Sequence, residues 1–313
     1  MSENGRLVVV LVLLGMGWGL SMPLTKIAVR DGYGHFGLVF WQLAIGAVVL
    51  GALQLIRRRP LPITPTTVIF CTFIAVLGTI LPNSVGYNAA YHLPAGIMSI
   101  AVSTVAMFAF PVALALGNDR FSVLRLLGLV LGLAGVALIA LPETSLPDPA
   151  MGIWILIALI APMCYALEGN IVAKWGTHGM GPIQTLFGAS VIGAVLALPL
   201  ALGSGQFIAP HWPPAQADLA LIALSTIHAV VYSTYVWLVG RAGSVFAAQV
   251  SYLVMGFGVL WSMALLGERY ALWIWAAFAL MLTGVALVQP RGKAPLAPAP
   301  APVQTARRPG NET

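Results

Sequence analysis

Charged residues are scarce in this sequence, at 8% of 313 residues, whereas 59% of the residues are hydrophobic. A soluble domain carries about 25% charged residues, because its surface has to face water. So few charges cannot cover a water-exposed surface, and most of this surface must therefore face lipid. The composition excludes an ordinary soluble protein and predicts an integral membrane protein embedded in a lipid bilayer.

Motifs for catalysis and metal binding are also missing. The two cysteines, Cys71 and Cys164, lie in apolar runs without CxxC or Cys/His spacing, so we interpret them as core residues. The chain has no HExxH motif and no paired carboxylates, and its five histidines are scattered. It has no GxxxxGKS or GxxxxGKT loop either, which excludes ATP as a direct energy source within this chain. We expect no enzymatic activity, no cofactor and no metal.

The net charge of +6 reflects membrane topology rather than affinity for nucleic acid, because Lys and Arg cluster in short segments between apolar runs. If the N-terminus lies inside, only Lys26, Arg30 and Arg269 fall towards the outside. The cytoplasmic side then carries Arg6, Arg57, Arg58, Arg59, Arg120, Arg125, Lys174, Arg241, Arg291, Lys293, Arg307 and Arg308. The positive-inside rule therefore predicts cytoplasmic N and C termini and a multi-pass protein of the inner (plasma) membrane.

The apolar runs predict an all-α fold of ten transmembrane helices. A span needs about 20 residues, since roughly 30 Å of hydrocarbon is crossed at about 1.5 Å per residue. No AxA-like cleavage site follows the first run, so we expect a retained helix rather than a signal peptide. Two divisions depend on tight turns, at His92-Leu93-Pro94 and at Arg241-Ala242-Gly243. The predicted spans are 7–29, 36–56, 67–91, 95–117, 122–141, 151–174, 182–203, 217–239, 244–266 and 271–289.

The second half of the chain repeats the first. The stretch LGNDRFSVLRLLGLVLGLAGVALIAL resembles LGERYALWIWAAFALMLTGVALV near the C-terminus, which aligns Arg120 with Arg269. Gly17-Trp18-Gly19-Leu20 aligns in the same way with Cys164-Tyr165-Ala166-Leu167. Because each half holds an odd number of helices, the second is inverted relative to the first, as in many secondary transporters. The predicted parts are a first five-helix repeat 1–142, a second five-helix repeat 143–290 and a disordered Ala/Pro-rich cytoplasmic tail 291–313.

We interpret the two LGER-like turns as structural, because glycine permits the turn while the acid and arginine pair or cap helix ends. These turns hold Asp119 with Arg120 and Glu268 with Arg269. The small-residue pairs Gly15xxxGly19 and Gly128xxxGly132 likewise favour close helix packing.

The duplicated LGER-like turn, each followed by a Gly-rich span ending GVAL, resembles the drug/metabolite transporter superfamily. Together with Gly17-Trp18-Gly19 and Lys26, it resembles more narrowly the ten-helix EamA-type branch of bacterial inner-membrane exporters, over residues 7–289. The resemblance implies a permease that moves a small molecule. The family often has Leu-x-Pro where this chain reads Ser103-Thr104-Val105 and Leu253-Val254-Met255. We therefore expect the fourth and ninth helices to be straighter.

Helical spacing gathers the polar and aromatic residues of the spans into stripes. Such groups at membrane depth usually face a partner helix or a wet cavity, which makes them candidates for substrate binding or coupling. Alternatively, the tyrosines only satisfy one another between helices or belong to an interfacial belt. Trp18 and Trp41 would offer π faces to an amphipathic or cationic substrate. The candidates in these stripes are Trp18, Lys26, Asn83, Tyr87, His228, Tyr232, Tyr235, Gln249 and Tyr252.

Glu168 is the one acid of nine that lies clearly within a predicted span. A charge at the centre of a bilayer costs about 2.5–3.5 kcal/mol on the insertion scale, so its presence needs a reason. Tyr165 shares its helix face, three residues earlier, whereas Lys174 does not. Three interpretations stay open: a proton carrier, a ligand for a substrate amine, or a structural partner across helices for a residue such as His228 or Lys26.

These features favour a secondary transporter, acting as an exporter of a small metabolite or drug-like solute by alternating access, with protons as an open partner. The alternative classes are a channel or a structural membrane protein, and a membrane-embedded enzyme is the least supported. The sequence leaves the substrate, the coupling ion and the oligomeric state open.

Overall fold

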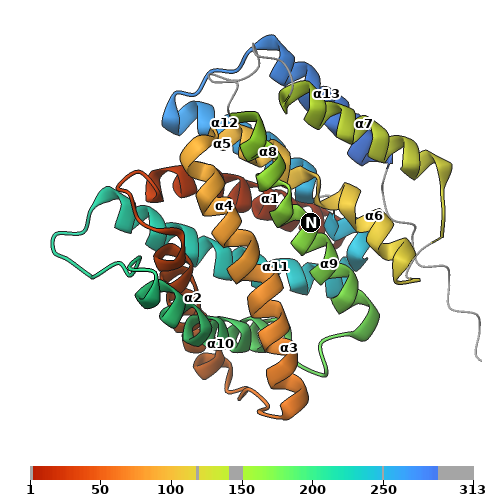
Figure 1. Cartoon of the computed structure of the whole chain (residues 1–313). Coiled ribbons are helices and arrows are strands. Elements are labelled where there is room, and N and C mark those ends of the chain that lie inside the picture. The colour runs from red at the N-terminus through yellow and green to blue at the C-terminus, as the bar shows by residue number, and fades with distance from the viewer. Residues whose placement is uncertain (1–2, 118–119, 141–150, 249, 288–313) are drawn as a thin grey trace, which may run out of the picture.

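The computed structural model describes residues 3–117, 120–140, 151–248 and 250–287 (Figure 1). Every regular element in these ranges is helical, as predicted. The predicted tail, 291–313, lies outside the described residues. The helices are α1 (Glu3–Ala28), α2 (His35–Arg57), α3 (Pro65–Ala75), the π-helix η1 (Val76–Ile80), α4 (Leu81–His92), α5 (Ala95–Ser103), α6 (Val105–Ala115), α7 (Val123–Ala140), α8 (Met151–Ala158), α9 (Ile160–Trp175), α10 (Pro182–Gly203), α11 (Gln216–Ala248), α12 (Val250–Leu266) and α13 (Leu272–Leu287).

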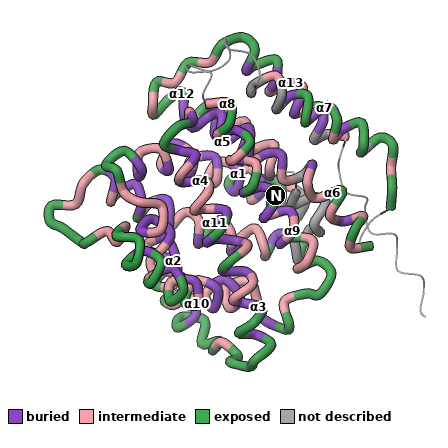
Figure 2. The backbone as a smooth tube through the Cα atoms, in the orientation of Figure 1, coloured by how far each residue is buried: buried purple, intermediate pink, exposed green. Residues whose placement is uncertain are grey.

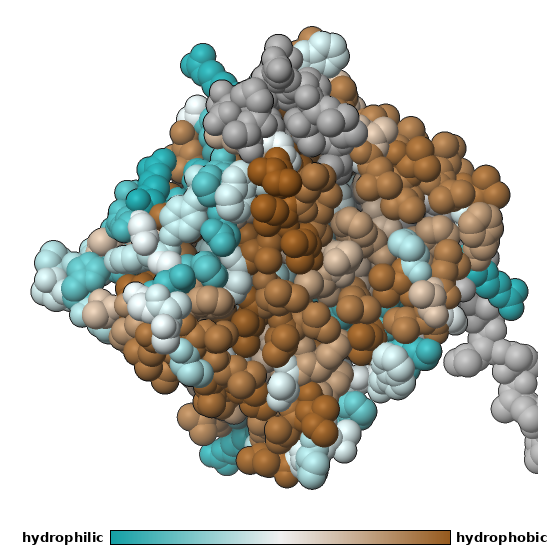
Figure 3. Space-filling model, in the orientation of Figure 1, coloured by the Kyte–Doolittle hydropathy of each residue, from teal (hydrophilic) through white to brown (hydrophobic). Residues whose placement is uncertain are grey.

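Seven helical stretches of the described chain are long and apolar enough to cross a membrane. Three shorter apolar helices, Leu126–Gly135, Val250–Leu266 and Leu272–Gly284, overlap the remaining predicted spans. Hydrophobic side chains cover much of the face seen in Figure 3. In a soluble protein this surface would have to face water, so the helices form a multi-pass membrane protein. The seven stretches are Gly5–Ala28, His35–Arg57, Pro65–His92, Ala95–Ala115, Met151–Trp175, Pro182–Gly203 and Gln216–Leu238.

One of the two predicted tight turns is confirmed and the other is wrong. The chain turns at Leu93 and Pro94, where α4 ends and α5 begins. At Arg241-Ala242-Gly243, by contrast, α11 continues to Ala248. Proline removes a backbone donor and stops a helix, whereas a lone glycine costs a helix only about 1 kcal/mol. Without a proline, this segment stays helical.

The fourth predicted span is interrupted at Thr104, where α5 ends and α6 begins. That this span is straighter than in other members of the family stays a prediction. The Ser103 hydroxyl donates to the Ile100 carbonyl at 2.6 Å, and the Thr104 hydroxyl donates to the Ala101 carbonyl at 2.7 Å. Such hydroxyls compete with backbone N–H groups for the carbonyls of the preceding turn. The corresponding helix of the second half, α12, runs without interruption from Val250 to Leu266.

Close glycine contacts hold the helices together, as the small-residue pairs predicted. Helix α1 packs against α11 and α12, α2 against α10, and α7 against α13 (Figure 1). A Cβ at Gly19 would lie 2.9 Å from the backbone nitrogen of Gly258, and one at Gly284 would lie 2.6 Å from the Gly128 carbonyl oxygen. Residues on the inner sides of the helices are buried and the peripheral loops are exposed (Figure 2). Backbones in such contact leave no room for side chains, so these glycines determine the packing.

Candidate functional site

The carboxylate of Glu168 lies between α9 and the π-helix η1. The residue is 4% exposed. A Cβ at Gly78, in the middle of η1, would lie 2.7 Å from Glu168 Oε1 and 2.8 Å from its Cδ. The carboxylate therefore occupies the space that a side chain at residue 78 would fill. π-Helical turns are rare and often mark functional sites. Helix periodicity gives no signal for Gly78, so the sequence did not indicate a role for this residue.

Tyr232 on α11 provides the hydrogen bond to this carboxylate. Its hydroxyl donates to Glu168 Oε1 at 2.5 Å. Within the described residues, no Lys, Arg or His forms an ion pair with Glu168. The partners suggested for a structural role, His228 and Lys26, are therefore not the residues that hold the carboxylate. A buried carboxylate with one neutral donor carries no compensating charge from the described residues.

A second set of polar side chains lies beside Glu168 and involves α2, α4 and α9. The Tyr165 hydroxyl donates to Asn83 Oδ1 at 2.9 Å rather than to Glu168. The Asn83 amide donates to Gln42 Oε1 at 2.9 Å, and the Tyr87 hydroxyl donates to the same oxygen at 2.8 Å. Gln42 is buried on α2 and was missed because it stands alone in an apolar run, without a stripe. These four side chains form a continuous hydrogen-bonded chain across three helices.

Aromatic rings lie around Tyr232, the donor to Glu168. The ring centroid of Trp18 lies 6.1 Å from that of Tyr232 and 5.2 Å from that of Tyr235. The His228 and Tyr232 rings meet edge to face at 5.6 Å. His228, Tyr232 and Tyr235, which the sequence placed in one stripe, therefore lie on one side of α11, and the two tyrosines contact Trp18 of α1.

A small cavity of about 20 Å³ adjoins this cluster, between α2, α10 and α11. Its polar lining comes from Gln42, Thr79, Ser190, Ser225, His228 and Tyr232. A polar space of this size has room for about one water molecule. In the described conformation this space is therefore too small to hold a metabolite.

Two of the predicted site residues lie elsewhere, and a third lies outside the described residues. Lys26 donates to the carbonyls of Ala90 at 2.6 Å and Leu93 at 2.9 Å, at the end of α4. Tyr252 on α12 packs against the main hydrophobic core. Gln249 is the residue that the structure does not describe. Trp41, considered as a π face, donates through its indole nitrogen to the Ile208 carbonyl at 2.9 Å.

The acid of the second LGER-like turn caps a helix of the first half. Glu268 accepts hydrogen bonds from the backbone N–H groups of Ala95 at 2.9 Å and Gly96 at 3.2 Å, where α5 begins. The Tyr270 hydroxyl also donates to this carboxylate. Burial, followed by the hydrogen bond to Glu268, raises the pKa of Tyr270. The turn at Leu93 is thus held by Lys26 on its carbonyl side and by Glu268 on its N–H side.

A buried polar cluster among membrane-crossing helices is an arrangement typical of membrane transporters. Comparison with known proteins agrees. Residues 6–141 and residues 152–289 each match the EamA-like transporter family. The chain belongs to this family. The resemblance to EamA-type transporters that the duplicated turn indicated is therefore confirmed.

Two relatives extend the comparison. "Uncharacterized transporter YvbV" of Bacillus subtilis (strain 168) is 28% identical over 296 residues, covering 92% of this chain and 93% of that protein. A solved crystal structure aligns with a TM-score of 0.63 at 17% identity, covering 91% of this chain and 98% of its own. The latter supports the fold alone. Family and relative together identify a membrane transporter and point away from an enzyme.

Proposed function

We propose that this chain is a secondary transporter that moves a small metabolite or drug-like solute out of the cell by alternating access, driven by protons. The observation that carries the proposal is the position of Glu168. Its carboxylate is buried, has a single neutral hydrogen-bond donor among the described residues and lies where the two family-matched stretches of the chain meet. We further propose that these stretches are the two inverted repeats, with both termini in the cytoplasm.

The polar cluster around Glu168 contains residues from both stretches, which supports a rocking mechanism. Gln42, Gly78 and Asn83 belong to residues 6–141, whereas Tyr165 and Glu168 belong to residues 152–289. If one stretch rotates against the other, the contact of Glu168 with Gly78 and the bond from Tyr165 to Asn83 must both change. Substrate and coupling sites of inverted-repeat transporters lie at such an interface. Opening of the small cavity would then provide the space for a substrate.

The missing counter-charge of Glu168 among the described residues supports proton coupling. An ionised carboxylate in a low-dielectric site is costly unless a cation balances it. Since no basic side chain of the described residues pairs with Glu168, a proton or a substrate cation has to do so. Competition between these two cations for one carboxylate would couple inward proton movement to outward substrate movement. A channel is less well supported, because the cavity beside the cluster has room for only about one water molecule in this conformation.

Purified protein in liposomes with an enclosed pH dye tests the proposal. A screen of amines, amino acids and nucleosides should find substrates that drive proton movement in the wild type. Glu168→Gln should abolish that movement, whereas Asp31→Asn, which removes an exposed acid, should leave it unchanged. Exchange of labelled substrate without a proton gradient should survive in Glu168→Gln if the residue serves coupling alone. Substrate movement without protons, equal in Glu168→Gln and wild type, would refute the coupling role and leave a uniporter or exchanger.

A further inference from the structure

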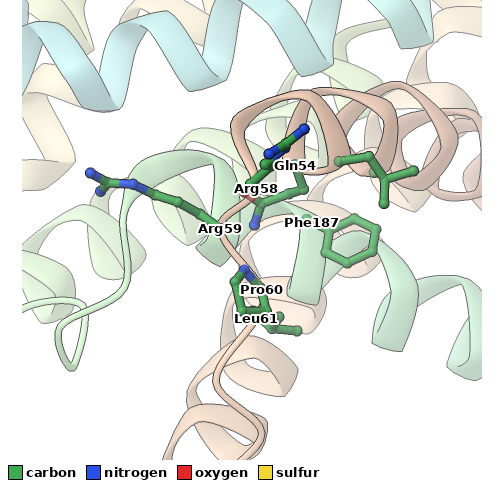
Figure 4. A pocket seen from close by; sticks show the side chains of 8 residues that line it. Gln54, Arg58, Arg59, Pro60, Leu61 and Phe187 are labelled. Carbon is green, nitrogen blue, oxygen red and sulfur yellow. The ribbon is translucent and has the colours of Figure 1, made fainter.

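A hollow of about 510 Å³ lies on the surface at the arginine-rich end of α2, apart from the Glu168 cluster. Its walls include Gln54, Leu55, Arg58, Arg59, Leu61 and Phe187 (Figure 4). Residues 54–61 end α2 and lead towards α3, while Phe187 belongs to α10. The hollow therefore spans one helix from each family-matched stretch, at one end of the contact between α2 and α10.

The segment that forms the hollow is held in place. Arg58 adopts a left-handed conformation with φ of 51°, and its backbone N–H donates to the Leu55 carbonyl, which ends α2. The Gln184 amide of α10 donates to the Pro60 carbonyl at 2.7 Å. Gln184 also accepts the backbone N–H of Gly181 at 2.9 Å, which fixes its own orientation at the start of α10. These contacts keep the two consecutive arginines at the rim of the hollow.

The polar groups of the hollow are hydrogen-bond donors and positive charges. Arg58 and Arg59 are exposed, and no Asp or Glu among the described residues lines the hollow. Gln54 is 8% exposed, and its amide nitrogen has no hydrogen-bond partner in the part of the chain that the structure describes. A buried donor without a partner costs about 1–3 kcal/mol, so an acceptor supplied from outside the chain would stabilise it. The Arg58 guanidinium and the Gln54 amide donor match the oxygens of a phosphate, and Arg59, whose side chain extends away from them in Figure 4, adds positive charge at the rim.

The rest of the lining is apolar and faces the lipid. Leu55 is 80% exposed on a helix that is apolar enough to cross the membrane. Phe187 lies against α2, since a Cβ at Gly51 would be 3.0 Å from its ring. In Figure 4, Arg58 and Gln54 lie on one side of the hollow, with Phe187 across from them and Pro60 and Leu61 below. A ligand that fits both parts has an anionic head and a hydrocarbon body.

We propose that this hollow binds one anionic phospholipid of the surrounding bilayer, with its phosphodiester on Arg58 and Gln54, Arg59 adding positive charge at the rim, and an acyl chain along Leu55 and Phe187. The end of a membrane-crossing helix is the depth at which lipid headgroups lie, and basic pockets between such helices bind anionic lipids. Because the lipid would contact both α2 and α10, it would bridge the two helices across the proposed repeat interface.

The test uses the full chain in detergent, offered equal amounts of phosphatidylglycerol and phosphatidylcholine at about 0.5 M salt, where long-range attraction between charges is screened. Native mass spectrometry counts the retained lipid. The wild type should retain phosphatidylglycerol in preference to phosphatidylcholine. Arg58→Gln should weaken that retention about tenfold, and Gln54→Leu about fivefold, since each removes a hydrogen bond to a charged group. The matched control is Arg57→Gln, which removes a charge from the same arginine run at a residue that does not line the hollow; its retention should stay within about twofold of wild type.

Equal retention of the two lipids by the wild type would overturn the proposal. So would equal losses in Arg57→Gln and Arg58→Gln, because the attraction would then be general rather than local. Displacement of the lipid by millimolar glycerol phosphate or inorganic phosphate would also overturn it, by identifying a site for a soluble anion. Thermal unfolding of each variant, expected to match the wild type for these exposed arginines, shows that the change in retention does not come from misfolding.

Discussion

Gly78 offers the most direct test of the site, because its missing side chain makes room for the Glu168 carboxylate. In Gly78→Ala the new Cβ would lie 2.7 Å from Oε1 and 2.8 Å from Cδ and Oε2, closer than such atoms approach in proteins. Glu168 must therefore move, and its 2.5 Å hydrogen bond from Tyr232 must lengthen or break. We expect Gly78→Ala to lose most substrate-driven proton movement in liposomes, although Glu168 itself is unchanged.

The expected stability change follows from two opposing terms. Overpacking a well-packed site costs about 1–3 kcal/mol. Replacing glycine by alanine in a helix stabilises it by about 0.5–1 kcal/mol. Gly86, also within the span that runs from Pro65 to His92, is the matched control, because a Cβ there would meet nothing within 4 Å. Gly86→Ala gains the helix stabilisation without the overpacking cost. The free energies of unfolding of the two variants should therefore differ by about 1–3 kcal/mol, with Gly78→Ala the less stable.

Chemical denaturation of both variants in the same detergent, followed by the liposome assay, measures these quantities. The expected result is that Gly86→Ala transports like the wild type and unfolds at the same or a higher denaturant concentration. If Gly78→Ala and Gly86→Ala are equal in stability and in proton movement, the position of the Glu168 carboxylate does not depend on the missing side chain at Gly78. The assignment of this site would then be wrong.

Three further substitutions test individual contacts. Tyr232→Phe removes the donor that the described residues provide to Glu168. We expect it to destabilise the protein by about 1–3 kcal/mol and to shift the pH dependence of transport. An unchanged pH profile would contradict the contact. Lys26→Met leaves the carbonyls at the end of α4 without their donor, and we expect the free energy of unfolding to fall by about 1–3 kcal/mol. In the control Arg30→Gln, which changes an exposed residue, the free energy of unfolding should stay within about 0.5 kcal/mol of wild type. Glu268→Ala removes the cap of α5 and should cost about 0.5–2 kcal/mol, seen as faster amide exchange at Ala95 and Gly96.

The sequence predicts the helices well, because the signal is simple. Long apolar runs separated by basic clusters leave few alternatives to membrane-crossing helices. The failures come from local backbone chemistry. The hydroxyls of Ser103 and Thr104 interrupt a helix that looked continuous, and the segment at Arg241 stays helical because nothing in it removes a backbone donor. Both cases depend on hydrogen bonds that hydrophobicity does not measure.

The site was predictable in part for the same reason. Glu168 stood out as an acid in an apolar run, and the spacing of His228, Tyr232 and Tyr235 placed them on one side of α11. Which groups Glu168 meets depends instead on how α9 packs against η1 and α11, and periodicity within one helix contains no information on that. Gly78 and Gln42 were missed because their roles exist only in the tertiary contact.

The origin of the contacts indicates what would change during transport. Glu168 and Tyr232 both belong to residues 152–289, whereas Gly78 belongs to residues 6–141. If the two stretches rock against each other, the Tyr232 bond is carried along with Glu168, and the contact with η1 is the one that breaks. The carboxylate would then lose the backbone that encloses it while keeping its donor, and it would exchange its proton where water enters. A disulfide between cysteines introduced at residues 78 and 168 should therefore stop transport, and its reduction should restore substrate movement without coupled protons, because the variant lacks the carboxylate. Full transport with the disulfide intact would show that the two stretches do not separate at this contact.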